Sequence, residues 1–334
     1  MQGFVIGGVM KNSSRELARL VGIGLFAISG LTTAQQTYPN KPIRFIVPYP
    51  PGGITTVITH LVGQNLTSAW GQPVIVDNRP GGNAVIGTDA LAKSAPDGYT
   101  ILLIAAAHVV VPHLLPMPYD ALKDFSAVAS LDASDQILVL SPSVPVNTLQ
   151  ELIAYAKARP GQLNYASAGN GSSNHLTSEL LNQQTGMQIR HIPYKGSGQA
   201  VTDVISGQVQ MTFNNPLPVA PFVKSGKLKA IVMSGDKRSS AMPDVPTFSE
   251  AGLPGFEAKN WHGVLAPAGT PRDIVSKLSA EFGRIMNTTD VKEKLVSQGV
   301  EPFITNPDQF AALLRADFAK WGKVIKAANI KIDN

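Results

Sequence analysis

Short apolar segments alternate with longer helix-like segments over most of this chain, and this alternation constrains the fold more than any other feature. The apolar segments fit buried strands, and the segments between them fit crossover helices. Such alternation predicts an α/β fold with mixed, mostly parallel sheets that are flanked by helices. Ligands of these sheets bind beyond the carboxyl ends of the strands.

The expected strands span residues 43–47, 74–77, 100–104, 136–140, 164–166, 188–193, 211–213, 230–233 and 263–266. The expected helices span residues 57–70, 85–93, 149–159, 173–185, 200–207, 219–225, 271–287 and 308–328. A chain of 334 residues exceeds a usual single core, which favours two lobes. We expect 35–137 and 265–334 to form lobe 1 and 138–264 to form lobe 2. The chain would cross near 137–141 and return near 260–267.

The N-terminal segment, residues 1–34, has the pattern of an export signal. Lys11, Arg15 and Arg19 precede an apolar stretch, 20–31, that is too short to span a bilayer. Small residues end the segment, which predicts cleavage after Ala34. The alternative is an amphipathic first helix of a cytoplasmic protein. We expect a periplasmic protein, soluble after removal of the signal peptide.

Composition excludes several classes of site. The chain has no cysteine, which excludes disulfides, thiolate zinc sites and a cysteine nucleophile. Removal of residues 1–34 takes away three positive charges and one negative charge, so the net charge falls from +5 to +3. No basic cluster is interleaved with aromatics, so we expect no nucleic-acid partner. No two histidines stand at helical spacing as a metal pair, and we expect neither a metal nor a cofactor.

The segment 48–56, Pro-Tyr-Pro-Pro-Gly-Gly-Ile-Thr-Thr, joins an expected strand to an expected helix. The first amides of a helix lack intrahelical partners, and the helix dipole adds positive potential there. A turn that contains Gly52 and Gly53 exposes such amides. We therefore predict an anion site at this loop.

The segment 165–175 also joins a strand to a helix and is rich in Ser, Gly and Asn. Ser172 or Ser173 is placed to cap the helix. The simplest interpretation is a well-capped helix start. Together with the 48–56 loop, however, this segment predicts the second side of a clamp for an anion.

Other polar residues follow further strands. His108 comes directly after the third strand, where it can donate to a ligand carboxylate or merely belong to a loop or helix cap. Asn214 and Asn215 follow a later strand and can hydrogen-bond a ligand without adding charge.

Three remaining candidates have simpler interpretations. His175 lies one turn into its helix and fits packing or capping better than ligand binding. Lys195 fits a solvated loop. Trp261 is equally suited to the cleft and to the core.

These segments, in this order, resemble the Bug family of periplasmic solute-binding receptors, also called the tripartite tricarboxylate transporter receptor family. The matching segments are 38–44, 50–53, 78–81, 96–100, 167–175, 192–196 and 266–271. Each one is weak alone, but seven in order are specific, and the likeness runs from about Tyr38 to the C-terminus.

The resemblance implies a two-lobed periplasmic binding protein fold of type II that holds a carboxylate between its lobes, often partly through ordered waters. The family's binding loops fall on 52–56, 106–108, 167–173 and the neighbourhood of 214–215. The implied ligand-binding residues are Gly52, Gly53, Ile54, Thr55, Thr56, Ala107, His108, Ser167, Asn170, Gly171, Ser172, Ser173, Asn214 and Asn215.

One position departs from the family pattern. Relatives commonly have Pro-Gly-Gly-x-x-Asp in the first loop, and this chain has Thr56 in place of the aspartate. A carboxylate there can receive an amino group or hold the loop's geometry. Its loss predicts an aliphatic or aromatic dicarboxylate without an ammonium group.

The leading hypothesis is therefore a non-enzymatic, monomeric receptor that captures a small organic carboxylate for membrane transporter subunits. A receptor that signals through a membrane sensor kinase is an alternative. A serine hydrolase that uses Ser167 or Ser172 with His108 or His175 is a third hypothesis, but no motif unites these residues with an orienting acid.

Overall fold

The computed structural model describes residues 1–4, 38–52, 54–239 and 242–331. Lys41–Asn334 forms one compact unit, and Met1–Asn40 is a separate one. Apart from residues 1–4, the predicted export signal lies outside the described residues, as does its cleavage point after Ala34. Gly53 of the first loop also lies outside them.

The strands of the compact unit form two sheets. The six-stranded sheet has the order β11-β4-β10-β3-β1-β2. Its strands are β1 (Ile43–Val47), β2 (Val74–Asn78), β3 (Thr100–Ala105), β4 (Phe125–Ser134), β10 (Asn260–Pro267) and β11 (Glu301–Pro302). β1 is parallel to β2 and β3, whereas β10 is antiparallel to β3 and β4.

The second sheet has five strands in the order β7-β6-β8-β5-β9. They are β5 (Ile137–Leu140), β6 (Asn164–Ser167), β7 (Arg190–Pro193), β8 (Met211–Asn214) and β9 (Lys229–Met233). β6 is parallel to β7 and β8, and β5 is antiparallel to β8 and β9.

The two sheets share one topology. The strands of the two sheets correspond one to one when the first sheet is read as β2-β1-β3-β10-β4 and the second as β7-β6-β8-β5-β9. In both sheets the fourth strand is antiparallel to its two neighbours. That strand enters from the other sheet: β5 follows β4 directly, and β10 follows β9. The predicted α/β class with two mixed sheets is confirmed, although antiparallel strand pairings slightly outnumber parallel ones.

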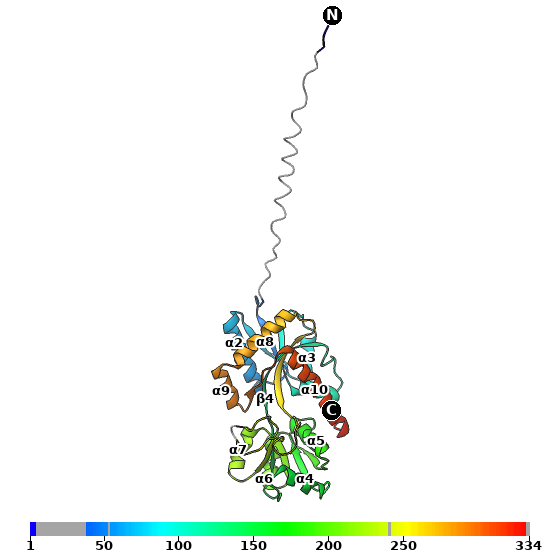
Figure 1. Ribbon diagram of the computed structural model, residues 1–334, viewed down its shortest axis with the longest axis vertical. Helices are drawn as coiled ribbons and strands as arrows, with labels where there is room; N and C mark the ends of the chain where they lie inside the picture. Colours follow the sequence, from blue (N-terminus) through cyan, green and yellow to red (C-terminus); the bar gives the residue numbers. More distant parts are fainter. Residues whose placement is uncertain (5–37, 53, 240–241, 332–334) are drawn as a thin grey trace. The chain divides into compact units, whose positions relative to one another are not determined.

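Helices accompany each sheet, as Figure 1 shows for α2, α3, α8, α9 and α10 beside the first and α4 to α7 beside the second. The α-helices are α2 (Ile54–Trp70), α3 (Val85–Ala92), α4 (Leu149–Lys157), α5 (Ser173–Thr185), α6 (Ser197–Ser206), α7 (Pro216–Lys224), α8 (Arg272–Met286), α9 (Thr289–Ser297) and α10 (Pro307–Ala327). Two short 3-10 helices, η1 (Ala106–Val109) and η2 (Val111–His113), follow β3.

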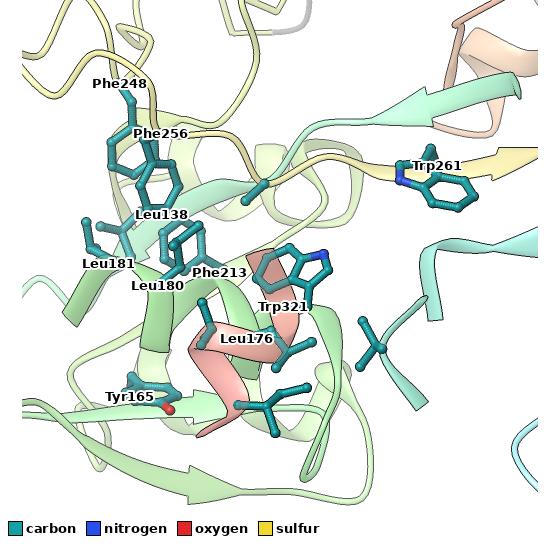
Figure 2. Close-up of a cluster of buried hydrophobic side chains, with 14 of the residues drawn as sticks. Leu138, Tyr165, Leu176, Leu180, Leu181, Phe213, Phe248, Phe256, Trp261 and Trp321 are labelled. Atoms are coloured by element: carbon teal, nitrogen blue, oxygen red, sulfur yellow. The ribbon is translucent and has the colours of Figure 1, made fainter. Parts of the chain in front are cut away.

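The core runs through both sheets. One cluster of buried apolar side chains contains Leu102 of β3 together with Leu138 of β5. Helix α10 contacts both β4 and α5, and Figure 2 shows its Trp321 near Leu176 of α5. Apolar packing thus joins the last helix both to the first sheet and to helix α5 beside the second sheet.

Several elements, among them β4, β11 and α9, were not expected from the sequence. Strand β4 was not predicted, because its sequence FSAVASLDAS is dominated by small and polar residues. These residues are nevertheless buried, since β4 lies between β10 and β11.

The sheet boundaries also differ from the predicted lobe limits. The chain leaves the first sheet after Ser134 and joins the second at Ile137, which is slightly earlier than expected. On the return, Asn260 already pairs with Ser134 in the first sheet, so residues 260–264 do not belong with the second sheet.

Candidate functional site

The first loop runs from the end of β1 to the start of α2. Gly52 has φ +96°, a left-handed conformation that glycine adopts without strain, and a Cβ there would meet open space. Ile54 is half-buried, whereas Thr55 and Thr56 are buried in the first turn of α2. The turn therefore brings the N-terminal end of α2 to the carboxyl end of β1.

Residues from neighbouring strands hold this loop in place. Asn78, at the end of β2, donates its Nδ2 to the carbonyl of Tyr49 at 3.0 Å and, more weakly, to Oγ1 of Thr56 at 3.5 Å. The hydroxyl of Tyr49 accepts the N–H of Ala105 at 3.3 Å. Burial raises the pKa of Tyr49 to about 12, so the phenol remains neutral. Thr56 thus lies against Asn78 and contributes to the loop's geometry.

The segment after β3 does not behave as predicted. Ala107 is exposed, but His108 is buried between the rings of Tyr119 and Phe125. Its Nε2 lies 2.9 Å from the carbonyl of Ala121 and therefore donates to it. Burial lowers the pKa of His108 to about 4. A neutral ring that donates to Ala121 has no second N–H, so the expectation that His108 donates to a ligand is corrected.

The second loop is bonded within itself. Ser167 Oγ accepts the N–H of Gly169 and also lies 3.1 Å from the carbonyl of Gly169. The hydroxyl of Ser172 donates to that carbonyl at 2.6 Å. Asn174 Oδ1 accepts the N–H of Ala168 at 3.3 Å, while Gly169 and Gly171 have φ of +127° and +75°. These bonds close the loop into a compact turn at the start of α5.

The turn leaves the N-terminal end of α5 without a side-chain cap. Ser172 has the N-cap backbone conformation but makes no side-chain cap hydrogen bond, because its hydroxyl is directed to Gly169. Ser173, which was also considered as a cap, is an exposed residue of the first turn. The first-turn amides therefore remain available to an anion, and the helix dipole favours one.

The remaining predicted residues lie at a third helix start. Asn214 is buried at the end of β8, and its Oδ1 accepts the N–H of Asn215 at 2.8 Å. Asn215 is exposed and is the N-cap of α7, again without a side-chain cap bond. Asn170 is exposed in the second loop.

The structure also shows where the three remaining candidate residues lie. Lys195 is exposed. Trp261 is a core residue, 1 % exposed, and its Nε1 donates to Asp317 at 2.8 Å. His175 is buried and accepts the N–H of Gly171 at its Nδ1, which confirms a packing and capping role.

A serine–histidine pair is present, but its serine is buried and its histidine is half-buried. Ser167 Oγ lies 2.5 Å from Nε2 of His191. Ser167 is 0 % exposed, and among the described residues no carboxylate hydrogen-bonds His191. The pair lacks the orienting acid and the access that a nucleophile needs.

Three residues that position these loops were not predicted. Tyr49 stood within the first loop segment, Asn78 within a segment that matches the family, and His191 within an expected strand. Nothing in their local sequence indicates that Asn78 reaches Tyr49 or that His191 reaches Ser167, because both contacts form between neighbouring strands.

A cavity of about 240 Å³ lies elsewhere, lined by Pro216, Leu217 and residues near 133–135, 233–239, 259 and 296–303. None of the predicted site residues lines it. It carries Asp135, Asp236 and Glu301 beside Lys237, Arg238 and Lys259, so neither charge sign dominates.

In the part of the chain that the structure describes, no group of three or more His, Cys, Asp or Glu side chains is arranged to hold a metal ion. No helix among the described residues is long and apolar enough to cross a membrane.

Comparison with known proteins identifies the family. The model of the tripartite tricarboxylate transporter family receptor, TctC, matches residues 58–330. The chain belongs to this family. It is 39% identical to BugT of Bordetella pertussis over 319 residues, which are 94% of this chain and 98% of BugT. This receptor family consists of periplasmic solute-binding proteins and not of enzymes.

Solved structures agree with this assignment. Rpa4515 of R. palustris with adipate is 32% identical to the receptor, with a TM-score of 0.69 over 88% of this chain and 99% of that one. MatC of Rhodopseudomonas palustris with bound malate is 30% identical, with a TM-score of 0.64 over 86% of this chain and 100% of that one. A TctC solute-binding protein from Polaromonas has a TM-score of 0.79 at 27% identity, over 87% of this chain and 100% of that one.

Proposed function

We propose that this receptor captures a small dicarboxylate without an amino group and delivers it to membrane transporter subunits. The observation that carries the proposal is the start of α5, where Ser172 leaves the first-turn amides uncapped. Helix amides bind a carboxylate without a buried cation, which avoids the desolvation cost of an imperfectly paired charge.

The charge of the loops supports the same ligand class. Segments 52–56, 106–108, 167–173 and 214–215 contain neither Asp nor Glu. An amino group in the ligand would therefore find no carboxylate partner in these segments. Adipate and malate, the ligands of the two R. palustris structures, are dicarboxylates without an amino group.

The ligand would lie between the two sheets, with the first loop and α2 on one side and the second loop and α5 on the other. No hydrogen bond among the described residues joins segment 48–56 to segment 167–173. The connections between the sheets, 135–136 and 234–259, would form the hinge on which the lobes close. Backbone amides, hydroxyls and the side chains of Asn170 and Asn215 would provide the contacts.

Native mass spectrometry of the purified protein tests the proposal, since a co-purified acid would be visible by its mass. A thermal-shift panel of adipate, malate, aspartate and glutamate then ranks ligands. We expect stabilisation by the first two. Strong stabilisation by aspartate or glutamate alone would show that the proposed ligand class is wrong.

Thr56→Asp is the matched variant for this panel. It restores the family's common carboxylate beside Asn78. We expect weaker binding of adipate and a relative gain for the amino acids. Thr67→Asp, on the same helix and away from the loop, controls for the added charge.

We further propose that the chain is exported, cleaved after Ala34 and monomeric. Intact mass of the periplasmic form tests the cleavage point, and light scattering tests the monomer. Neighbouring genes distinguish transport from sensing: small and large membrane subunits indicate uptake, whereas a sensor kinase indicates signalling.

A further inference from the structure

Two histidines from different elements stack beneath the second loop. His175 of α5 and His191 of β7 have ring centroids 3.7 Å apart and planes inclined by 14°. Tyr165 of β6 lies opposite His191 in the strand register, with ring centroids 5.0 Å apart. The strand pairing therefore fixes His191, and α5 lays His175 upon it.

Each ring holds one point of the loop. Nδ1 of His175 accepts the N–H of Gly171 at 3.0 Å, which requires the tautomer with the proton on Nε2. Nε2 of His191 is hydrogen-bonded to Ser167 Oγ at 2.5 Å. Ser167 at the beginning of the loop and Gly171 in its second half are thus each held by a histidine ring.

These contacts determine the direction of the Ser172 hydroxyl. Ser167, held by His191, bonds the N–H of Gly169 and so places the Gly169 carbonyl. That carbonyl accepts the hydroxyl of Ser172. A serine at an N-cap otherwise turns its oxygen toward the helix amides. Self-capping by Ser172 would compete with an anionic ligand for the same donors.

We propose that His175 and His191 are positioning residues for ligand binding, because they hold the 167–172 loop in the form in which Ser172 does not cap α5. This inference rests on the proposed function, from which it takes the carboxylate ligand. The physical cause that it invokes is the geometry of the loop. The acceptor atom at Nδ1 of His175 and the polar atom at Nε2 of His191 carry the effect, and the bulk of the rings does not.

The surroundings keep both rings neutral. Burial lowers the pKa of His175 to about 3, with a further contribution from the charge that His191 would carry, and burial lowers the pKa of His191 to about 4. The titratable Tyr165 lies beside both rings, and its hydroxyl donates to Glu179. Nδ1 of His175 therefore stays an acceptor throughout the neutral range.

Paired variants separate the polar atoms from the rings. His175→Leu and His191→Leu remove the polar atoms, whereas His175→Asn and His191→Gln retain one at a similar position. Amide hydrogen exchange follows the loop without any ligand, and calorimetry with adipate follows binding. We expect faster exchange at Gly171 and roughly tenfold weaker adipate binding in the leucine variants, with partial recovery in the amide variants. His60→Leu, at an exposed histidine of α2, controls for loss of an imidazole.

The two hypotheses fail in different ways. Unchanged exchange at Gly171 in His175→Leu overturns the inference, whatever the protein binds. Faster exchange with undiminished adipate affinity also overturns it, because the loop would then not matter to binding. If the unmutated protein binds no carboxylate of the panel, the proposed function is wrong.

Discussion

The two loops have the same design in sequence but are held in different ways. Both join a strand to a helix through glycines, one at 48–56 and the other at 167–173. The first is braced from neighbouring strands through Asn78 and Ala105. The second is bonded within itself and supported by His175 and His191. Similar local sequences therefore gain their rigidity from different tertiary contacts, and the loops should respond differently to the same kind of change.

The largest effect is expected from alanine at the loop glycines. Gly169→Ala places a side chain at φ +127°, although its Cβ would be 3.4 Å from the nearest atom, the carbonyl oxygen of Tyr194. The cost is backbone strain of about 1–3 kcal/mol, together with loss of adipate binding. Gly52→Ala meets open space at φ +96° in a loop held at fewer points, so a smaller loss of stability is expected.

Chemical unfolding measures the loss of stability, and calorimetry measures the loss of adipate affinity. Gly196→Ala is the matched control, because it is equally strained at φ +143° but lies outside both loops. It should lose stability and retain affinity. Equal losses of affinity in Gly169→Ala and Gly196→Ala would contradict the role of the second loop.

The next effect concerns the brace of the first loop. Asn78→Asp keeps the shape of the side chain but removes the donor to Tyr49 and adds a negative charge beside the predicted anion site. We expect about 1–2 kcal/mol of lost stability and weaker adipate binding. Thermal unfolding and calorimetry measure these changes.

Asn65→Asp is a suitable control for this change. Asn65 also donates its Nδ2 to a backbone carbonyl, that of Leu61, but inside α2. It should lose stability without losing affinity. Hydrogen exchange in segment 167–173 should not change in Asn78→Asp, and a change there would show that the two loops are not held independently.

A smaller effect is expected from acid. The pKa values of His175 and His191 in the folded protein are about 3 and about 4, below the ordinary value of 6.5. The unfolded state therefore binds more protons below pH 6.5, and the free energy of unfolding falls as the pH falls. With solvent screening allowed for, each imidazole contributes about 1 kcal/mol of this loss at pH 5.

Urea unfolding at pH 8 and at pH 5 measures the loss. The double variant His175→Asn, His191→Gln should lose less stability between these pH values than the unmodified protein. His108 retains its own contribution in both, because burial also lowers its pKa, to about 4. Equal losses would show that the stacked pair does not titrate as proposed.

The smallest effect is expected at the N-cap of α5. Ser172→Ala removes the bond to Gly169 but no helix cap, so we expect a stability loss below about 1 kcal/mol and little change in affinity. Thr148→Ala disrupts the capping box of α4 and should cost about 1 kcal/mol. A larger loss for Ser172→Ala would show that Ser172 does cap α5 in solution.

Much of the fold was predictable from periodic patterns, although β4 was not. Strand β1 and helix α5 were predicted with the bounds that the structure has. β4 could not be recognised, because its small and polar residues are buried by neighbours that are distant in sequence, such as Phe303, whose carbonyl accepts the hydroxyl of Ser130.

For the candidate site, the sequence indicated which loops matter but not how their side chains are directed. His108 stood at the expected place after β3, yet its ring is directed to Ala121. Ser172 stood at the N-cap, yet its hydroxyl is directed to Gly169. A rotamer depends on the partners that packing supplies, and these partners do not appear in a local pattern.

The sequence by itself determined the two strand-to-helix loops, because glycine permits the positive φ of a tight turn and proline fixes its own φ wherever they occur. Only the tertiary structure decided that Asn78 braces the first loop and that two stacked histidines support the second. Those contacts join residues such as Ser167 and His191, which come together when β6 pairs with β7. Strand pairing sets their distance, and burial lowers the pKa of both histidines and keeps their rings neutral.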